Sequence, residues 1–158
     1  MALYRSLGAA FGVAWPLAGL ALVSWYEGDV AQARALFAES LALFQSTGDR
    51  RGQTWATHGL GLVAWTQGEL ADAAALHEQA LVLAEETGDR REVALLQIGL
   101  GFVAEARGAS REGQQRFLTA LATERDLGNT WGISMCLEGL VGGILDSQPL
   151  VAVHLLAA

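Results

Sequence analysis

Residues 47–86 read TGDRRGQTWATHGLGLVAWTQGELADAAALHEQALVLAEE, and this stretch recurs with a period of forty residues on both sides. The glycines show the period most clearly, in one series at Gly8, Gly48, Gly88 and Gly128 and in a second at Gly28, Gly68 and Gly108. A fixed period of this size is typical of stacked repeats, which bury their apolar faces against one another. We therefore expect one repeat domain over residues 1–158, with units at 7–46, 47–86 and 87–126 and a partial unit at 127–158.

Each unit contains two amphipathic segments separated by glycines, which predicts a pair of helices. The first helix of each pair is expected at residues 10–26, 50–66, 90–106 and 130–145, and the second at 30–46, 70–86 and 110–126. The glycines suit the left-handed residue that ends a helix, and Asp49 and Asp89 suit the N-cap that follows. Because the connections are short, neighbouring helices should be antiparallel.

Both ends of the chain depart from this pattern. Residues 1–7 match the end of a second helix, so we expect Gly8 to end a preceding helix. Pro16 should lie in the first turn of a new helix near Trp15, and the alternative is that the helix bends at Pro16. Pro149 suits another helix start, and residues 150–158 would begin a further second helix. Because these end segments are apolar, we also expect a homo-oligomer that buries them.

Composition and charge narrow the class of protein. An apolar content of 52% excludes a disordered chain, and a net charge of −7 argues against a nucleic-acid partner. Residues 6–26 carry no charge and, taken alone, would also suit a membrane span or a signal peptide. Their match to residues 46–67, which include Asp49 and Arg50, favours a soluble repeat helix and no membrane partner. The single cysteine, Cys136, favours a reducing compartment, and hence the cytoplasm.

No combination of residues predicts an active site. His58, His77 and His154 lack nearby ligands, so we expect no metal, and His77 occupies a position that suits core packing. Cys136 lies in an apolar helical run, so its pairing with a histidine as a nucleophile is the weaker alternative. Gly59-Leu60-Gly61 lies within a helix and lacks the context of a nucleotide loop. These glycines should instead let the paired helices approach closely, and we expect a protein that is not an enzyme and needs no cofactor.

The second unit resembles a tetratricopeptide repeat. The residues that carry the resemblance are Leu60-Gly61, Gly68-Glu69-Leu70, Ala73, His77 and Ala80. The forty-residue period resembles the longer variant found in kinesin light chains and bacterial regulators, and the sequence is similar to the C-terminal repeat regions of bacterial signal-transduction ATPases and LuxR-type regulators. Ser24, Ala64 and Ala104 depart from it, since they stand where the repeat usually has tyrosine. The resemblance implies an all-α, right-handed superhelical solenoid of antiparallel helix pairs.

The resemblance also implies a scaffold or sensor for protein–protein interaction. The first helices would line a concave groove that accepts a peptide, a helix or a partner protein. An alternative is an inducer-binding domain of a larger transcriptional regulator, which should show a closed pocket with convergent polar groups. In a third interpretation the tryptophans pack between helices and line no groove. The candidate groove residues are Trp15, Leu22, Trp25, Tyr26, Trp55, His58, Leu62, Trp65, Leu95, Ile98, Phe102 and Met135.

Overall fold

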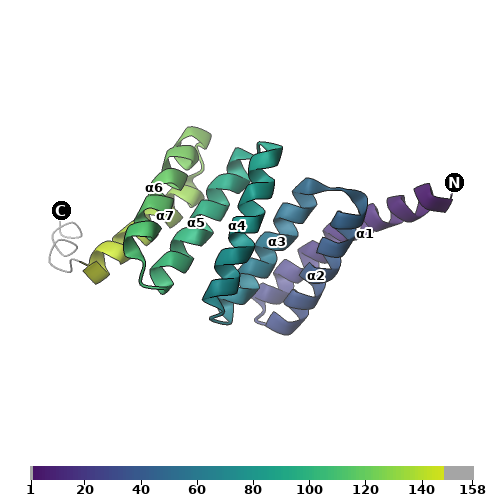
Figure 1. Ribbon diagram of the computed structural model, residues 1–158, viewed down its shortest axis with the longest axis horizontal. Coiled ribbons are helices and arrows are strands. Elements are labelled where there is room, and N and C mark those ends of the chain that lie inside the picture. Colours follow the sequence, from purple (N-terminus) through teal and green to yellow (C-terminus); the bar gives the residue numbers. More distant parts are fainter. Residues whose placement is uncertain (1, 148–158) are drawn as a thin grey trace. The chain divides into compact units, whose positions relative to one another are not determined.

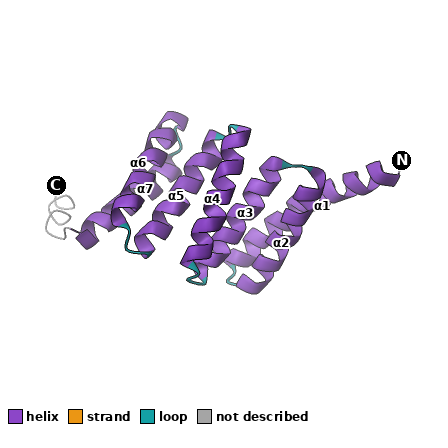
Figure 2. Ribbon diagram, in the orientation of Figure 1, coloured by secondary structure: helices purple, strands orange, loops and turns teal. Residues whose placement is uncertain are grey.

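The computed structural model describes the backbone of residues 2–147 and the side chains of residues 12–142, and it consists of helices joined by short turns (Figures 1 and 2). The helices in this part of the chain are α1 (Ala2–Tyr26), α2 (Val30–Thr47), α3 (Arg50–Thr66), α4 (Leu70–Thr87), α5 (Arg90–Ala106), α6 (Ser110–Leu127) and α7 (Thr130–Ser147). From α2 to α7 they begin and end within two residues of the predicted bounds. The all-α fold of helix pairs is therefore confirmed. Pro149 and residues 150–158, where another helix was expected, lie outside the described residues.

The turns between helices follow the predicted chemistry. Gly48, Gly88 and Gly128 end α2, α4 and α6 in the left-handed conformation, with φ of 71°, 70° and 65°. The Asp49 carboxylate then accepts a hydrogen bond of 2.9 Å from the backbone N–H of Gly52 at the start of α3. Such a cap satisfies one of the amide groups that the first turn of a helix leaves free, so the Gly48–Asp49 junction both ends α2 and begins α3.

Helix α1 corrects two predictions. It runs without a break from Ala2 to Tyr26, so Gly8 does not end a helix, and Pro16 lies in the helix interior rather than in a first turn. A glycine permits the left-handed conformation but does not impose it, which explains Gly8. Proline removes the hydrogen bond to the carbonyl of Gly12, and packing of α2 and α3 against α1 compensates for this loss. None of the helices in the described part of the chain has the length and apolar character that a membrane crossing demands.

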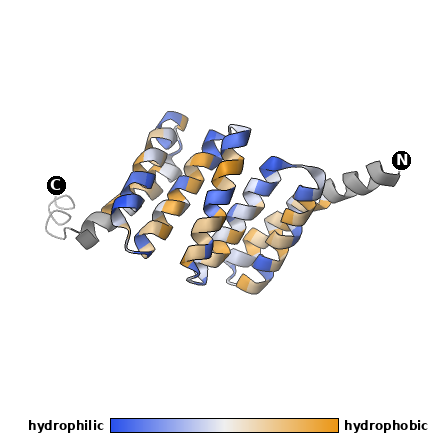
Figure 3. Ribbon diagram, viewed as in Figure 1, coloured by the Kyte–Doolittle hydropathy of each residue, from blue (hydrophilic) through white to orange (hydrophobic). Residues whose placement is uncertain are grey.

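The chain divides into two compact units, Met1–Gly88 and Asp89–Ala158. In the first unit α2 packs against α1 and α3, and α4 packs against α3. In the second unit α6 packs against α5 and α7. Hydrophobic residues are interspersed with hydrophilic ones along the helices of both units (Figure 3), as expected for amphipathic helices that bury one face.

The core of each unit is built around phenylalanines of the second helix of a pair. In the first unit Phe37 and Phe44 of α2 are fully buried between small residues of α1 and α3. In the second unit Phe117 of α6 packs with Ile98 and Cys136. The small residues around Phe37 and Phe44 are Ala14, Ala18, Ala21, Ala33 and Ala56.

Glycines in the first helices make room for these rings. A Cβ atom on Gly59 would lie 2.3 Å from the Phe37 ring, and one on Gly61 would lie 2.5 Å from the His77 ring. Real Cβ atoms essentially never come this close to another atom. The predicted packing role of Gly59 and Gly61 is confirmed, but the neighbour that they admit is an aromatic ring rather than the backbone of the paired helix.

Candidate functional site

Trp15 and Trp55, two of the predicted groove residues, pack between helices of the first unit. Trp15 of α1 meets the Phe44 ring edge-on at 5.0 Å and lies 6.3 Å from the Trp55 ring. Trp55 of α3 also lies 6.3 Å from Phe37. The indole Nε1 of Trp15 donates a hydrogen bond of 3.2 Å to the carboxylate of Asp49, the N-cap of α3. Both tryptophans are half-buried in these contacts, as the packing interpretation expected.

His58, another predicted groove residue, is buried beside His77. The two rings lie 5.0 Å apart, and Nδ1 of each is buried without a hydrogen-bond partner. Burial, and then the neighbouring His77, lowers the pKa of His58 to about 3, and burial lowers the pKa of His77 to about 4. Both rings are therefore neutral at pH 7 and form part of the core. Within the described residues no group of three or more His, Cys, Asp and Glu side chains could hold a metal ion.

Three other predicted aromatic residues lie at the C-terminal ends of their helices, two on α1 and one on α3. We call Trp25, Tyr26 and Trp65 the aromatic patch. The indole Nε1 of Trp25 donates a hydrogen bond of 2.8 Å to Oγ1 of Thr66, which joins the two helix ends. The Tyr26 ring meets that of Trp25 edge-on at 5.0 Å. Tyr26 is 75% exposed and Trp65 is 40% exposed, so the patch offers aromatic surface to solvent.

An ion pair and a hydrogen bond fix the backbone around this patch. Arg34 of α2 donates to Glu69 at 2.6 Å and also to Gln67. Gln67 and Glu69 form the turn that follows Trp65 and Thr66, so Arg34 ties α2 to the end of α3. The backbone carbonyl of Leu62, one turn before Thr66, accepts a hydrogen bond from the Thr66 hydroxyl. The Leu62 side chain is half-buried. Leu22, also predicted, packs against the core around Phe37.

The predicted residues of the second unit lie with its core. Ile98 is only 2% exposed, and Phe102 meets the Phe117 ring edge-on at 5.0 Å. Met135 of α7 packs against the same cluster. Leu95 is half-buried on α5. In this unit the structure thus brings three of the predicted residues together, chiefly as packing around Phe117.

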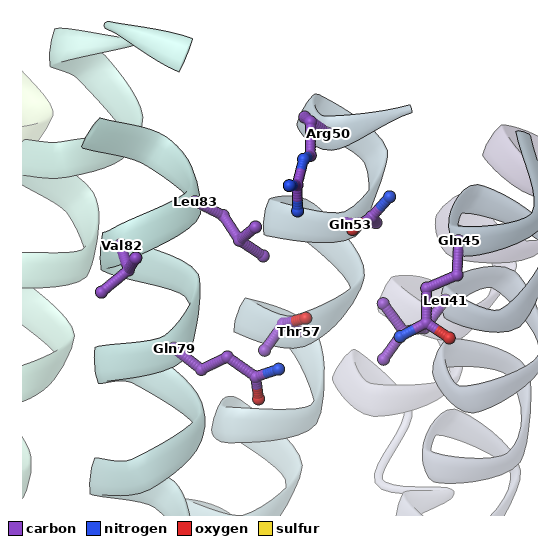
Figure 4. Close-up of a pocket in the computed structure, with 8 residues that line it drawn as sticks. All are labelled: Leu41, Gln45, Arg50, Gln53, Thr57, Gln79, Val82 and Leu83. Atoms are coloured by element: carbon purple, nitrogen blue, oxygen red, sulfur yellow. The ribbon is translucent and has the colours of Figure 1, made fainter. Parts of the chain in front are cut away.

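A pocket of about 420 Å³ lies between α2, α3 and α4 in the first unit (Figure 4). Gln79 and Leu83 point from α4 toward α3, where Thr57 lies between them and the side chains of α2 (Figure 4). The Thr57 hydroxyl is buried and has no hydrogen-bond partner. The lining residues are Leu41, Gln45, Arg50, Gln53, Thr57, Gln79, Val82 and Leu83.

None of the pocket residues was among the predicted site residues. One feature of the sequence indicates them. Gln53 is polar, whereas the equivalent residues of the neighbouring units are Val13 and Val93. Polar residues at a repeat position that is apolar elsewhere are candidates for a local site.

The single thiol is poorly suited to nucleophilic chemistry. Cys136 is fully buried, and burial, followed by the charge of Glu124, raises its pKa to about 11. The thiolate is the nucleophilic form, so this thiol is unreactive at neutral pH. His58 and His77, the two histidines that the structure describes, belong to the other compact unit.

A family model described as a tetratricopeptide repeat matches residues 12–86 of the chain. The match covers most of the first unit, from α1 to α4, and supports a tetratricopeptide-type repeat there. Repeats of this architecture generally provide surfaces for protein–protein interaction. No curated protein matches the chain.

Proposed function

We propose that the chain is a non-enzymatic scaffold or sensor module that binds a peptide, a helix or a partner protein at the aromatic patch of the first unit. The observation that carries the proposal is the exposure of Tyr26 beside a hydrogen-bonded Trp25, with an exposed Trp65 directly before Thr66, the hydrogen-bond partner of Trp25. Exposed apolar patches commonly mark interaction sites, and tryptophan and tyrosine often carry most of the binding energy of an interface. Trp25 is held in place before binding, which lowers the entropy cost of forming a complex.

The charges around the patch favour a partner segment that carries both an apolar anchor and a basic side chain. Glu27 directly follows Tyr26 and is exposed, and Asp29, two residues later, caps α2. The net charge of the whole chain is −7. Complementary charge mainly raises the rate and specificity of association, so binding should weaken as salt is added.

A peptide-display selection on the whole chain, followed by calorimetric titration of the selected peptides, tests this proposal. Trp65→Ala should weaken binding of those peptides by about 2 kcal/mol or more, which is the cost of removing a central aromatic contact. Trp131→Ala is the matched control, because Trp131 is 57% exposed but belongs to the second unit. Selected peptides that bind both variants as tightly as the parent would refute the assignment to the aromatic patch.

The pocket between α2, α3 and α4 favours a second candidate function, a small-molecule inducer site in a larger transcriptional regulator. Its volume is within the range of about 300–1,000 Å³ that is typical of ligand pockets, and Gln45, Gln53 and Gln79 supply polar groups. A thermal-shift screen of polar metabolites tests it, with Gln79→Leu as the variant. A compound that stabilises the parent chain but not this variant would favour the inducer site over the aromatic patch.

Three further expectations complete the proposal. We place the chain in the cytoplasm, since a single buried cysteine suits a reducing compartment. We expect the apolar end segments to support a homo-oligomer, and the two compact units to form one repeat domain. Sedimentation at about 100 μM, far above a micromolar dissociation constant, tests the homo-oligomer. A clean monomer at that concentration would contradict it.

A further inference from the structure

The pocket between α2, α3 and α4 contains a buried hydroxyl group that lacks a hydrogen-bond partner. Thr57 lines the pocket and is 1% exposed, and its Oγ1 has no partner among the described residues. Leaving a buried polar group unpaired costs free energy, so such groups usually bond to water or to a ligand. The pocket holds about 420 Å³, whereas one water molecule takes up about 30 Å³. It therefore has room for a small organic molecule that bonds to Thr57.

The mouth of the same pocket carries an arginine that is only loosely paired. Arg50 of α3 forms an ion pair with Glu86 of α4, but the N–O distance of 3.6 Å is beyond the range of a hydrogen bond. Both side chains are more than half exposed, so this ion pair contributes little. A guanidinium group offers its N–H donors in a planar fork that matches a carboxylate. Arg50 can therefore bind the carboxylate of a ligand more closely than it binds Glu86.

The second unit shows the two equivalent positions with their polar groups hydrogen-bonded. Arg90, forty residues after Arg50, donates a hydrogen bond of 2.9 Å to a carboxylate of α6. Gln97, forty residues after Thr57, accepts a hydrogen bond of 3.2 Å from Arg116. The repeat can thus satisfy both positions from within the chain. In the first unit it leaves both of them able to bind a ligand.

The lining residues of α3 form a row with a cationic end and a neutral end. Arg50, Gln53 and Thr57 are three and four residues apart, so they lie on one face of the helix. At a rise of about 1.5 Å per residue, the backbone positions of Arg50 and Thr57 are about 10 Å apart. Figure 4 shows Arg50 at one end of this row and Gln79 reaching from α4 toward Thr57 at the other. A ligand that fills the row has an anionic group at one end only.

Carboxamides and apolar side chains line the rest of the pocket. Nε2 of Gln53 donates a hydrogen bond of 3.2 Å to the backbone carbonyl of Phe44, so its oxygen remains as an acceptor for the pocket. The Gln79 carboxamide and the Thr57 hydroxyl can each donate and accept. An amide group of a ligand, with one N–H and one carbonyl, matches them in both respects. The apolar lining residues are Leu41, Val82 and Leu83.

We propose that the pocket binds a small carboxylic acid that also carries an amide group and an apolar side chain, as an N-acyl amino acid does. The carboxylate binds Arg50, and the amide group bonds to Thr57 and Gln79. The apolar side chain packs against Leu83 and its neighbours. This inference rests on the second candidate function given above, a small-molecule site in this pocket, and names the chemical class of its ligand. It does not depend on the aromatic patch.

NMR titration of the whole chain with N-acetyl derivatives of the apolar amino acids, each paired with its uncharged C-terminal amide, tests the proposal. At least one acid should cause saturable shifts around the pocket, and its amide should bind at least about tenfold more weakly, because the charge-assisted bond to Arg50 is lost. Arg50→Gln should weaken binding of the acid by a similar factor. Arg90→Gln is the matched control, since Arg90 is about as exposed but belongs to the second unit. It should leave binding unchanged.

Thr57→Val separates a role in binding from a role in folding. Valine keeps the volume and removes the unpaired hydroxyl, so the free chain should melt at the same or a higher temperature, whereas the acid should bind about fivefold more weakly. Acids that bind no better than their amides, or that bind the Arg50→Gln variant as tightly as the parent, would overturn the proposal. A neutral metabolite whose binding depends on Gln79 would then still support the small-molecule site. Failure of every acid and every metabolite to bind would remove both.

Discussion

At the scale of single residues, the same repeat position has opposite requirements in α1 and α3. Gly59 admits the Phe37 ring, whereas Gly19, forty residues earlier, faces open space. An alanine at either position removes the excess backbone freedom of glycine, but only at Gly59 does its methyl group collide with a packed ring. The consequence of adding one carbon atom should therefore change sign between the two sites.

Gly59→Ala should lower the free energy of unfolding by about 1–3 kcal/mol, the usual cost of forcing extra volume into a packed core. Gly19→Ala should raise it by about 0.5–1 kcal/mol, because alanine is the better helix former and nothing obstructs it. Urea denaturation of both variants checks the pair. A loss of stability in Gly19→Ala would show that the space beside Gly19 is already filled.

The buried histidines make stability depend on pH. In the unfolded chain each histidine takes up a proton below its ordinary pKa of 6.5, whereas in the folded chain the pKa is about 3 for His58 and about 4 for His77. The unfolded state therefore binds more protons as the pH falls, and stability is lost from about pH 6.5 downward. Each histidine should cost about 2 kcal/mol between pH 7 and pH 5.

His77→Phe is the control for this effect, since Phe37 and Phe117 occupy the same position in the neighbouring units. The substitution adds volume to the core, so it should change stability at pH 7 by at most about 1–3 kcal/mol, the usual cost of overpacking. It should also remove about half of the loss between pH 7 and pH 5. An unchanged pH dependence would show that other groups cause it.

At the scale of helices, α2 to α7 could be predicted from the sequence because their ends are local features. A left-handed glycine and an N-capping aspartate act within one turn, so residues such as Gly48 and Asp49 specify a junction by themselves. The interior of α1 could not be predicted in this way. Whether a helix continues through Pro16 depends on contacts with α2 and α3, which local sequence does not reveal.

Pro16→Ala tests that explanation. Pro16 is exposed, so its replacement removes little packing, and alanine restores the backbone donor to the carbonyl of Gly12. We expect the free energy of unfolding to rise by about 1–3 kcal/mol. An interior proline costs a helix about 3 kcal/mol, and part of this gain is lost because alanine makes the unfolded chain more flexible. Chemical denaturation measures it. A fall in stability would argue for a helix that begins at Pro16.

The candidate site, too, could be predicted only as far as local sequence determines it, and not where it depends on tertiary packing. Repeat phase places Trp15 with Trp55 and Trp25 with Trp65, and it correctly groups them on the first helices. It does not distinguish Trp15, Trp25 and Trp55, which pack on the cores around Phe44 and Phe37, from Trp65, which stays exposed, because that depends on side chains from α2. The pocket was missed for a related reason, since Thr57 and Gln79 meet only when α3 and α4 pack.

At the scale of the whole molecule, both compact units use rings packed over glycines, but they differ in exposed surface. The aromatic patch and the pocket both belong to Met1–Gly88, and the family match at residues 12–86 lies there as well. In the second unit Trp131 and Leu137 are the exposed counterparts on α7. We therefore place the interaction surface of the molecule in the first unit.

Fluorine NMR of the chain labelled with 5-fluorotryptophan tests this claim most directly. The five tryptophans give separate probes, and single Trp→Phe variants assign them. Addition of a display-selected peptide should shift the Trp65 and Trp25 resonances in a saturable way and leave Trp131 unchanged. A peptide that binds while only Trp131 shifts, or while Trp65 and Trp25 both stay in place, would contradict the account.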